Sequence, residues 1–427
     1  MNFRASFTFL LGMLLVAPFA IGLAQDENSE LVPIKSRPVE EINPAQSSSS
    51  DFSKRIKIPL DLKAPEDTEE SMRILSESGS TLELTINPRM QRHLEKFLQD
   101  RGNPVAAAVV VEVSTGNVLA MVQGKAPRDW GATVHSALYS AFPAASLFKT
   151  IVSSAAIEVT GLDPDQPIGL SGGCAHVGPT GQWLRQDVWD RRNPMTLRRA
   201  YGLSCNGFFA KIAINILGLG AINEFAERFG WGRPVDADFM TEISPINTPP
   251  PANSSVQTVG RYAAGFGYVG TSAAHAAWWT LAIANRGIPK PLKILKNPTT
   301  ENISLANSPL SARSWFTPII SPTTSDTLRS IMSATTHGGT ASFAFRPSKF
   351  KSFRGGVGGK TGTLTGHSPK GLTTWFTGMM PLDKPEVVVA AVALLPDDVW
   401  FIKGPNLAAE SLWAFHEFHS QTSNYSR

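Results

Sequence analysis

The sequence is poor in cysteine, in net charge and in long apolar runs, and each shortage excludes a class of protein. Two cysteines, Cys174 and Cys205, in 427 residues are too few for a disulfide scaffold and allow at most one bridge. The 39 basic and 35 acidic side chains leave an unclustered net charge of +4, which gives no case for nucleic-acid binding. The histidines lack the spacing of metal ligands. What remains is a globular composition, with 42% hydrophobic residues for one large domain or two small ones.

The one long apolar run lies at the N-terminus. Arg4 precedes an almost wholly apolar stretch from Phe7 to Ala20, and a Gly-Leu-Ala triplet then provides the small residues that a signal peptidase recognises. We therefore expect a signal peptide in residues 1–24. An uncleaved anchor is the alternative, because Phe7–Ala24 is about long enough to span a bilayer. Either reading places the rest of the chain outside the cytoplasm, in the periplasm or at the outer face of the cytoplasmic membrane.

The next segment, residues 25–80, is polar and irregular. Such a composition buries little apolar surface, so we expect a largely disordered tether. The alternative is that Arg55–Leu62, where apolar residues alternate, adds an edge strand to the folded part. We expect the folded domain to begin near Thr81 and to occupy residues 81–427.

The order of β-forming and helical segments predicts an α/β fold. Val105–Val113 and Val118–Val122 flank a Ser-Thr-Gly-Asn turn, which predicts a hairpin, and a second hairpin is expected at Thr373–Met380 and Val387–Leu395. Between them lies a long, mostly helical region. Helices are also expected in three segments: Pro88–Asp100, Ala144–Val159 and Leu407–Phe418. Strands at both ends of a helical middle imply a sheet assembled from distant segments.

The first candidate for chemistry is Ser146-Leu147-Phe148-Lys149 at the start of the expected central helix. A spacing of three places the serine and the lysine on one helical face, within reach of each other. A serine hydroxyl is a poor nucleophile until a base takes its proton, and a desolvated lysine can be that base. By itself the pair is a weak signal, because serine and lysine often stand three apart on a helix without any function.

Two further motifs follow along the chain. In Ser204-Cys205-Asn206 a hydroxyl and an amide two residues apart would face one cleft while the cysteine points inward, although serine and asparagine also favour helix caps and turns. In Lys360-Thr361-Gly362-Thr363 a strand glycine allows close approach of a ligand, and the lysine and threonines are suited to bind a carboxylate. The alternative for this motif is an ordinary exposed strand end.

Taken together and in this order, the three motifs resemble the signature of β-lactamases and penicillin-binding proteins: a serine–lysine pair, Ser-Asp-Asn and Lys-Thr-Gly. The likeness extends from about Thr81 to Phe418 and is strongest to high-molecular-mass penicillin-binding proteins. It includes Ala108–Met121, which is similar to an opening hairpin of that family, and four shorter landmarks: Gly265-Phe266-Gly267, Ala284-Asn285-Arg286-Gly287, Gly339-Thr340-Ala341 and Trp375-Phe376-Thr377-Gly378. The resemblance implies an α/β (α+β) fold, with a central antiparallel sheet flanked by helices and a mostly helical subdomain.

The chain departs from this family in three places. Pro143-Ala144-Ala145 stands where most relatives have proline-glycine before the nucleophile, and the large N-terminal pedestal or glycosyltransferase domain of relatives is not seen here. Cysteine replaces the aspartate of the second motif, as in elongation-type enzymes that carry a second cysteine upstream. Cys174 is the counterpart here, and in an oxidising compartment either a Cys174–Cys205 bridge or two buried thiols would result.

The resemblance also implies a mechanism and partners. Ser146 would attack a D-alanyl-D-alanine stem peptide of peptidoglycan, Lys149 would accept its proton, and Ser204 would pass a proton to the leaving group. Asn206, Lys360, Thr361, Gly362 and Thr363 would bind the substrate, without a metal or an organic cofactor. β-Lactams would be covalent inhibitors, and cell-wall machinery proteins are possible partners.

Four functions share these motifs. A D,D-transpeptidase passes the acyl group to an amine, and a D,D-carboxypeptidase passes it to water. A serine β-lactamase hydrolyses its acyl-enzyme quickly, in class A with the help of a glutamate. Glu158 is the only glutamate between Ser146 and Ser204, and we expect it to face elsewhere, so we favour the transpeptidase. A non-enzymatic β-lactam sensor or scaffold is the fourth reading.

Overall fold

The computed structural model describes residues 71–75, 81–103, 105–124, 135–170, 172–174, 177, 193–246, 250–251, 253–267, 269–297, 317–350, 356–367, 370–395 and 402–420. Its centre is a five-stranded antiparallel sheet in the order β4-β3-β9-β8-β7. The strands are β3 (Val105–Glu112), β4 (Val118–Gln123), β7 (Gly358–His367), β8 (Lys370–Met380) and β9 (Val387–Leu395). Because the N-terminal hairpin pairs with the last strand, with Val109 opposite Ala390, the expected sheet from distant segments is confirmed.

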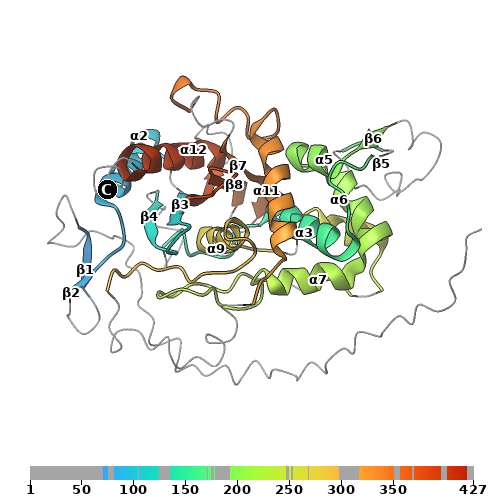
Figure 1. Ribbon diagram of the computed structural model, residues 1–427, viewed down its shortest axis with the longest axis horizontal. Helices are drawn as coiled ribbons and strands as arrows, with labels where there is room; N and C mark the ends of the chain where they lie inside the picture. Colours follow the sequence, from blue (N-terminus) through green and yellow to red (C-terminus); the bar gives the residue numbers. More distant parts are fainter. Residues whose placement is uncertain are drawn as a thin grey trace, which may run out of the picture. The chain divides into compact units, whose positions relative to one another are not determined.

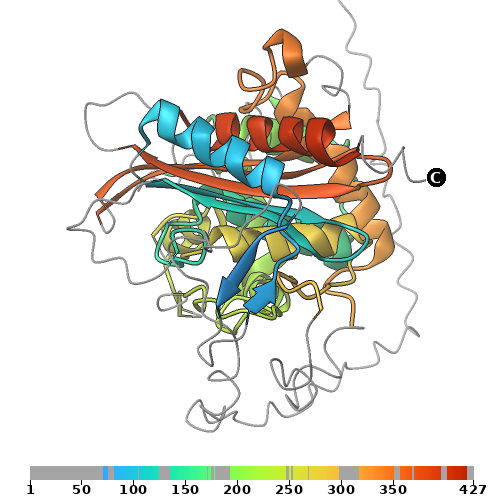
Figure 2. The same cartoon turned by 90° about the vertical axis from the view of Figure 1, so that its left-hand side faces the viewer.

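Helices cover both faces of this sheet. Along β3 and β9, alternate residues point to opposite sides. Ala108 and Val389 pack with the helices α2 (Pro88–Arg101) and α12 (Gly404–Phe415), whereas Val109 and Ala390 pack with the core around α9 (Ala273–Ala284). Figure 2 shows α2 and α12 side by side above the sheet and α9 beneath it. Burial on both faces explains why these strands are continuous apolar runs.

The middle of the chain forms the expected helical subdomain, seen to the right of the sheet in Figure 1. Its elements are the 3₁₀ turn η2 (Ala145–Phe148), α3 (Lys149–Thr160), α5 (Leu197–Leu203), α6 (Asn206–Ile212), the π-helical η4 (Ala213–Leu217), α7 (Gly218–Arg228) and α8 (Val256–Ala263), with the two-residue strands β5 (Ile168–Gly169) and β6 (Pro194–Met195) at its edge. The run Asn206–Arg228 is apolar and long enough to cross a membrane. Phe208, Phe209 and Phe225 on it are fully buried, which is typical of a core helix.

The folded part begins earlier than the sequence predicted. The strand β1 (Arg73–Leu75) pairs with β2 (Thr81–Glu83), and Met72 and Ile74 are buried in the core, although both lie in the expected tether. The expected signal peptide, most of the expected tether and the alternative edge strand at Arg55–Leu62 lie outside the described residues.

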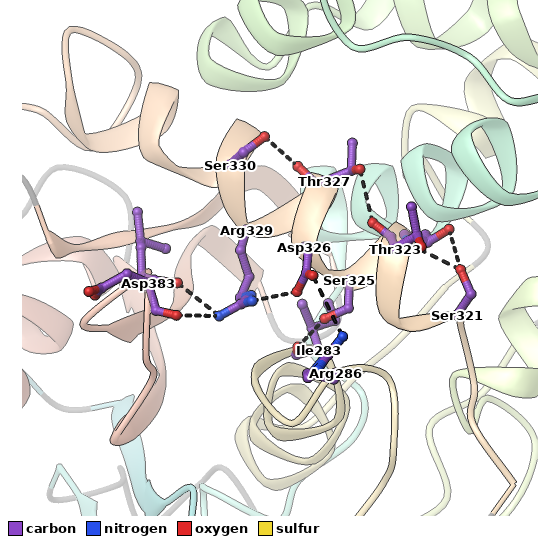
Figure 3. Close-up of polar contacts among 12 residues, drawn as sticks. Ile283, Arg286, Ser321, Thr323, Ser325, Asp326, Thr327, Arg329, Ser330 and Asp383 are labelled. Atoms are coloured by element: carbon purple, nitrogen blue, oxygen red, sulfur yellow. Dashed lines mark hydrogen bonds and ion pairs between the residues drawn. The ribbon is translucent and has the colours of Figure 1, made fainter.

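Helix α11 (Pro322–Thr336) joins the sheet to the helical subdomain (Figure 3). The Ser321 hydroxyl caps its first turn by accepting from the N–H of Thr324. In its middle, Arg329 donates to the carbonyls of Leu382 and Asp383, in the turn between β8 and β9, at 3.0 and 3.1 Å. Because α11 packs along β7 and α5, it brings the residues after its C-terminus, including Thr340, to the edge of the sheet that carries the site.

Candidate active site

Ser146 lies in η2, one turn before the regular helix α3 begins. The backbone before it is fixed from three sides. The Ala144 N–H donates to the Val269 carbonyl at 2.9 Å, the Trp375 indole donates to the Pro143 carbonyl at 2.9 Å, and Gly265 packs against the Ala145 carbonyl. Trp375, a family landmark in the sequence, thus helps to place the nucleophile.

Ala145 adopts a left-handed conformation, with φ of 50°. Glycine reaches that conformation without steric cost, whereas an alanine there costs roughly 1–2 kcal/mol. The conformation persists because the contacts around it hold the turn in place.

Gly265 is expected to be essential for the position of this turn. A Cβ on Gly265 would lie 1.8 Å from the Ala145 carbonyl oxygen, so Gly265→Ala must displace the backbone next to Ser146. We expect the rate of acylation by penicillin to fall about 100-fold, since displacements of about 1 Å have effects of that size. Gly267→Ala is the matched control, because Gly267 also has positive φ but has open space around its Cβ position. Equal acylation rates in the two variants would contradict this role.

Lys149 is fully buried, and its amine is the centre of the site. Nζ donates to Ser146 Oγ at 2.9 Å, to Ser204 Oγ at 3.2 Å and to the Ser204 carbonyl at 2.8 Å. It also donates to Asn206 Oδ1 at 2.5 Å. The sequence-predicted pair Ser146–Lys149 and the second motif therefore meet at one nitrogen.

Lys360 approaches the Ser204 hydroxyl from strand β7 of the sheet. Its Nζ donates to Ser204 Oγ at 2.9 Å and to the Thr361 carbonyl at 3.0 Å, and its side chain is fully buried. Ser204 Oγ thus lies between two lysine amines. The sequence assigned Lys360 to carboxylate binding. The structure places its amine on Ser204, where it also acts on the charge of Lys149.

Burial controls the charge of both lysines. Burial, together with the nearby positive charge of Lys360, holds the pKa of Lys149 well below the usual lysine range. Burial lowers the pKa of Lys360 to about 7. When the Lys149 amine is neutral, its lone pair can accept the proton of the Ser146 hydroxyl, in place of the hydrogen bond that the charged amine donates to Oγ, so the site meets the requirement for activating a serine.

The pH dependence of acylation is expected to report this coupling. Lys360→Met removes the nearby charge and so raises the pKa of Lys149. At a given pH below that pKa, less of Lys149 is then neutral, and the acid limb of the acylation rate profile shifts to higher pH. Lys360→Arg keeps the charge and is expected to keep the midpoint near that of the wild type. A midpoint in Lys360→Met that equals the wild-type value would contradict the coupling.

Ser204 and Asn206 reach Lys149 from the junction of α5 and α6. Ser204 ends α5 in the left-handed conformation, with φ of 56°, and Cys205 precedes α6. Cys205 is buried, as expected for a side chain that points inward. Its sulfur forms a disulfide with Cys174, so of the two alternatives the structure has the bridge. The bridge and the Gly207 N–H, which donates to the Cys174 carbonyl, hold this junction against residues 172–174.

Strand β7 forms the other wall of the site. Thr361 and Thr363 line a cleft of about 300 Å³ together with Ser146 and Ser204. Gly362 lies next to the nucleophile turn, where a side chain would be crowded. A Cβ at this position would lie 3.1 Å from the Ala144 carbonyl oxygen. Thr340, in the Gly-Thr-Ala landmark, has its hydroxyl 2.5 Å from that of Thr361. Of the eight site residues named from the sequence, Ser146, Ser204, Thr361 and Thr363 line the cleft, and the other four lie beside or behind them.

Four of the residues that line the cleft carry no sequence motif: Phe343, Thr374, Lys403 and Pro405. Thr374 lies opposite Thr363 on β8, a neighbour that only the sheet register reveals. The other three come from the segment after α11 and from the start of α12. Among the described residues, no three His, Cys, Asp or Glu side chains gather closely enough to hold a metal ion.

Comparison with known proteins gives one family. The family model described as "Penicillin binding protein transpeptidase domain" matches residues 106–400. No curated protein sequence matches the chain.

Solved structures share the fold. The D,D-transpeptidase domain of a peptidoglycan glycosyltransferase from Eggerthella lenta is 21% identical, with a TM-score of 0.62 over 82% of this chain and 96% of that one. The transpeptidase domain of Burkholderia pseudomallei penicillin-binding protein 3 is 21% identical, with a TM-score of 0.61 over 79% and 96%. An imipenem acyl-enzyme complex of penicillin-binding protein A from M. tuberculosis is 20% identical, with a TM-score of 0.61 over 79% of each chain.

Proposed function

The chain belongs to the penicillin-binding protein transpeptidase domain family, and from this premise we propose that it is a peptidoglycan D,D-transpeptidase acting through an acyl-enzyme on Ser146. One observation carries the proposal. Ser146 Oγ, Lys149 Nζ and Ser204 Oγ form a continuous hydrogen-bonded chain at the wall of a cleft. This is the arrangement that acyl transfer by a serine requires.

Acylation begins with neutral Lys149 taking the proton of the Ser146 hydroxyl. Oγ forms a bond to the carbonyl carbon of the penultimate D-alanine of the stem peptide. The oxyanion that results is stabilised by the backbone N–H groups of Ser146 and Thr363, and losing one such donor typically costs about 100- to 1000-fold in rate. The bond to the terminal D-alanine then breaks.

The leaving amine needs a proton, and the short path runs through Ser204. The Ser204 hydroxyl passes its proton to the leaving amine. It lies 3.2 Å from Lys149 Nζ, which holds the proton taken from Ser146, and 2.9 Å from Lys360 Nζ, and either amine can return a proton to Ser204. Asn206 orients the substrate amide from the same side. Thr361 and Thr363 present hydroxyls to the terminal carboxylate.

The acyl group then passes to an amine of a neighbouring stem peptide, with the same lysine as base. A carboxypeptidase would pass it to water. The residues that line the cleft in the described part of the chain include no carboxylate to activate water. The Glu158 carboxylate accepts from the Ser321 N–H at 2.9 and 3.0 Å, at the start of α11, and this contact supports the transpeptidase over a class A β-lactamase.

Two measurements on the wild-type protein separate the candidates. The proposal predicts that label from a fluorescent penicillin persists through a chase, and that a donor peptide with an amine acceptor gives more cross-linked than hydrolysed product. Fast loss of label with consumption of penicillin would identify a β-lactamase. Hydrolysis alone, at all acceptor concentrations, would identify a carboxypeptidase, and no reaction with either compound would indicate a scaffold.

The proposal includes the location. Peptidoglycan stem peptides are outside the cytoplasm, and the apolar N-terminus supports export to the periplasm or to the outer face of the cytoplasmic membrane. Proteolytic protection of the chain in intact cells, lost when the outer layers are permeabilised, tests it.

A further inference from the structure

Lys403 stands out among the residues that line the cleft. Its neighbours there are serine and threonine hydroxyls, Phe343 and Pro405, so among the described lining residues Lys403 alone is charged. It lies directly before α12, next to Thr374 on β8, and its side chain is half-buried. No family motif contains it, and nothing in the mechanism above uses it.

Phe343 holds this lysine at the cleft. The ammonium nitrogen lies 5.9 Å from the centre of the Phe343 ring, within the range of a cation–π contact. Phe343 itself is 40% exposed, although phenylalanine is usually buried. Within the described part of the chain, the Lys403 ammonium has no carboxylate partner. The Phe343 ring thus positions the Lys403 ammonium, and its charge is available to a ligand in the cleft.

A substrate carboxylate in this cleft needs a counter-charge. Thr361 and Thr363 can donate hydrogen bonds, but a carboxylate removed from water without a cation is costly. Lys360 is fully buried and is not part of the cleft lining, and its donors are directed to Ser204 Oγ and the Thr361 carbonyl. Since burial lowers its pKa to about 7, it also carries only part of a charge near neutrality.

We propose that Lys403 is the cation that binds the terminal carboxylate of the substrate, in a subsite shared with the hydroxyls of Thr361 and Thr363 and steadied by Phe343. The proposal rests on the proposed acyl-transfer function and deepens it. It divides the two charged tasks of the site: Lys360 acts on Ser204 and Lys149, and Lys403 acts on the substrate. Lys403 is a specificity-determining residue in this scheme and takes no part in proton transfer.

The test compares benzylpenicillin with its methyl ester, which lacks the carboxylate charge. Acylation rates of both compounds are measured by intact-protein mass spectrometry for the wild type, Lys403→Met and Lys403→Arg. We expect Lys403→Met to acylate about 10- to 100-fold more slowly with the acid, the effect of losing one charged hydrogen bond, and at the wild-type rate with the ester. Lys403→Arg keeps the charge and is expected to keep most of the rate with the acid.

Methionine preserves the aliphatic stem that packs near Phe343, and the ester rate reports whether the site is intact. Lys384 is an exposed lysine in the turn between β8 and β9. The Lys384→Met variant is the control for overall charge and is expected to react like the wild type with both compounds. An equal loss with acid and ester in Lys403→Met, or no loss with the acid, would overturn the role of Lys403. A folded wild-type protein that reacts with neither compound would instead overturn the proposed function, and this inference with it.

Discussion

Replacing Ser146 by alanine is expected to abolish covalent labelling of the folded protein by a fluorescent penicillin. Ser146 Oγ is the hydroxyl that Lys149 contacts at the cleft wall, and alanine has no oxygen to form the ester. We do not expect the neighbouring Ser204 hydroxyl to substitute for it, because that hydroxyl lies between the two lysine amines and is placed for proton transfer. The measurement is the intensity of the labelled band after denaturing electrophoresis.

Ser342→Ala is the matched control for this variant. Ser342 is a half-buried serine next to Phe343 at the cleft, and it does not contact Lys149. It is expected to label like the wild type. Circular dichroism of both variants establishes that the fold is retained. Stable label on folded Ser146→Ala would mean that the nucleophile is a different residue.

The second large effect is expected at Lys149. Lys149→Met removes the base but keeps the apolar stem, so the Ser146 hydroxyl remains in place without a group to accept its proton. A positioned general base typically contributes about 100- to 10,000-fold, and we expect the acylation rate to fall by that factor. Stopped-flow or quenched-flow measurement with a chromogenic cephalosporin gives the rate.

A second buried lysine serves as the control. Lys211 on α6 is almost as buried as Lys149, but its amine donates to the Gly169 carbonyl at 2.7 Å, away from the nucleophile. Lys211→Met therefore tests the loss of a buried amine without the loss of the base, and it is expected to acylate within a few-fold of the wild type. If both variants slowed acylation equally, the effect would come from the fold and Lys149 would not be the base.

The strands of the sheet were predictable where the local sequence is an apolar, β-forming run. Val105–Glu112 and Val387–Leu395 are apolar β-forming runs, and their ends are set by turn residues that act locally. Their pairing was expected only in outline, since strand order depends on which faces the helices cover. The start of the fold was missed at β1 (Arg73–Leu75), because a three-residue strand has too few residues to show a period.

The site was predictable as a set of residues but not as a geometry. The order of the Ser146, Ser204 and Lys360 motifs identified which residues belong to the site. That Lys360 donates to Ser204 and so affects Lys149 depends on the distance between β7 and the junction of α5 and α6, which no spacing in the sequence encodes. Lys403 was missed for a similar reason, since it reaches the cleft only because α12 packs over the sheet beside Thr374.

The measurement that tests the central claim most directly is the mass of the peptide bearing Ser146 after reaction with a donor peptide ending in D-alanyl-D-alanine. The reaction is quenched in acid within milliseconds to seconds, with and without an acceptor amine, and the protein is digested. The account predicts that this peptide gains the mass of the donor minus the mass of one free D-alanine, because the proton of the serine hydroxyl leaves with the alanine amine. It also predicts that the adduct is absent from Ser146→Ala, and that added acceptor removes it while cross-linked product forms. Release of D-alanine without any adduct on Ser146, or an adduct on another residue, would contradict the account.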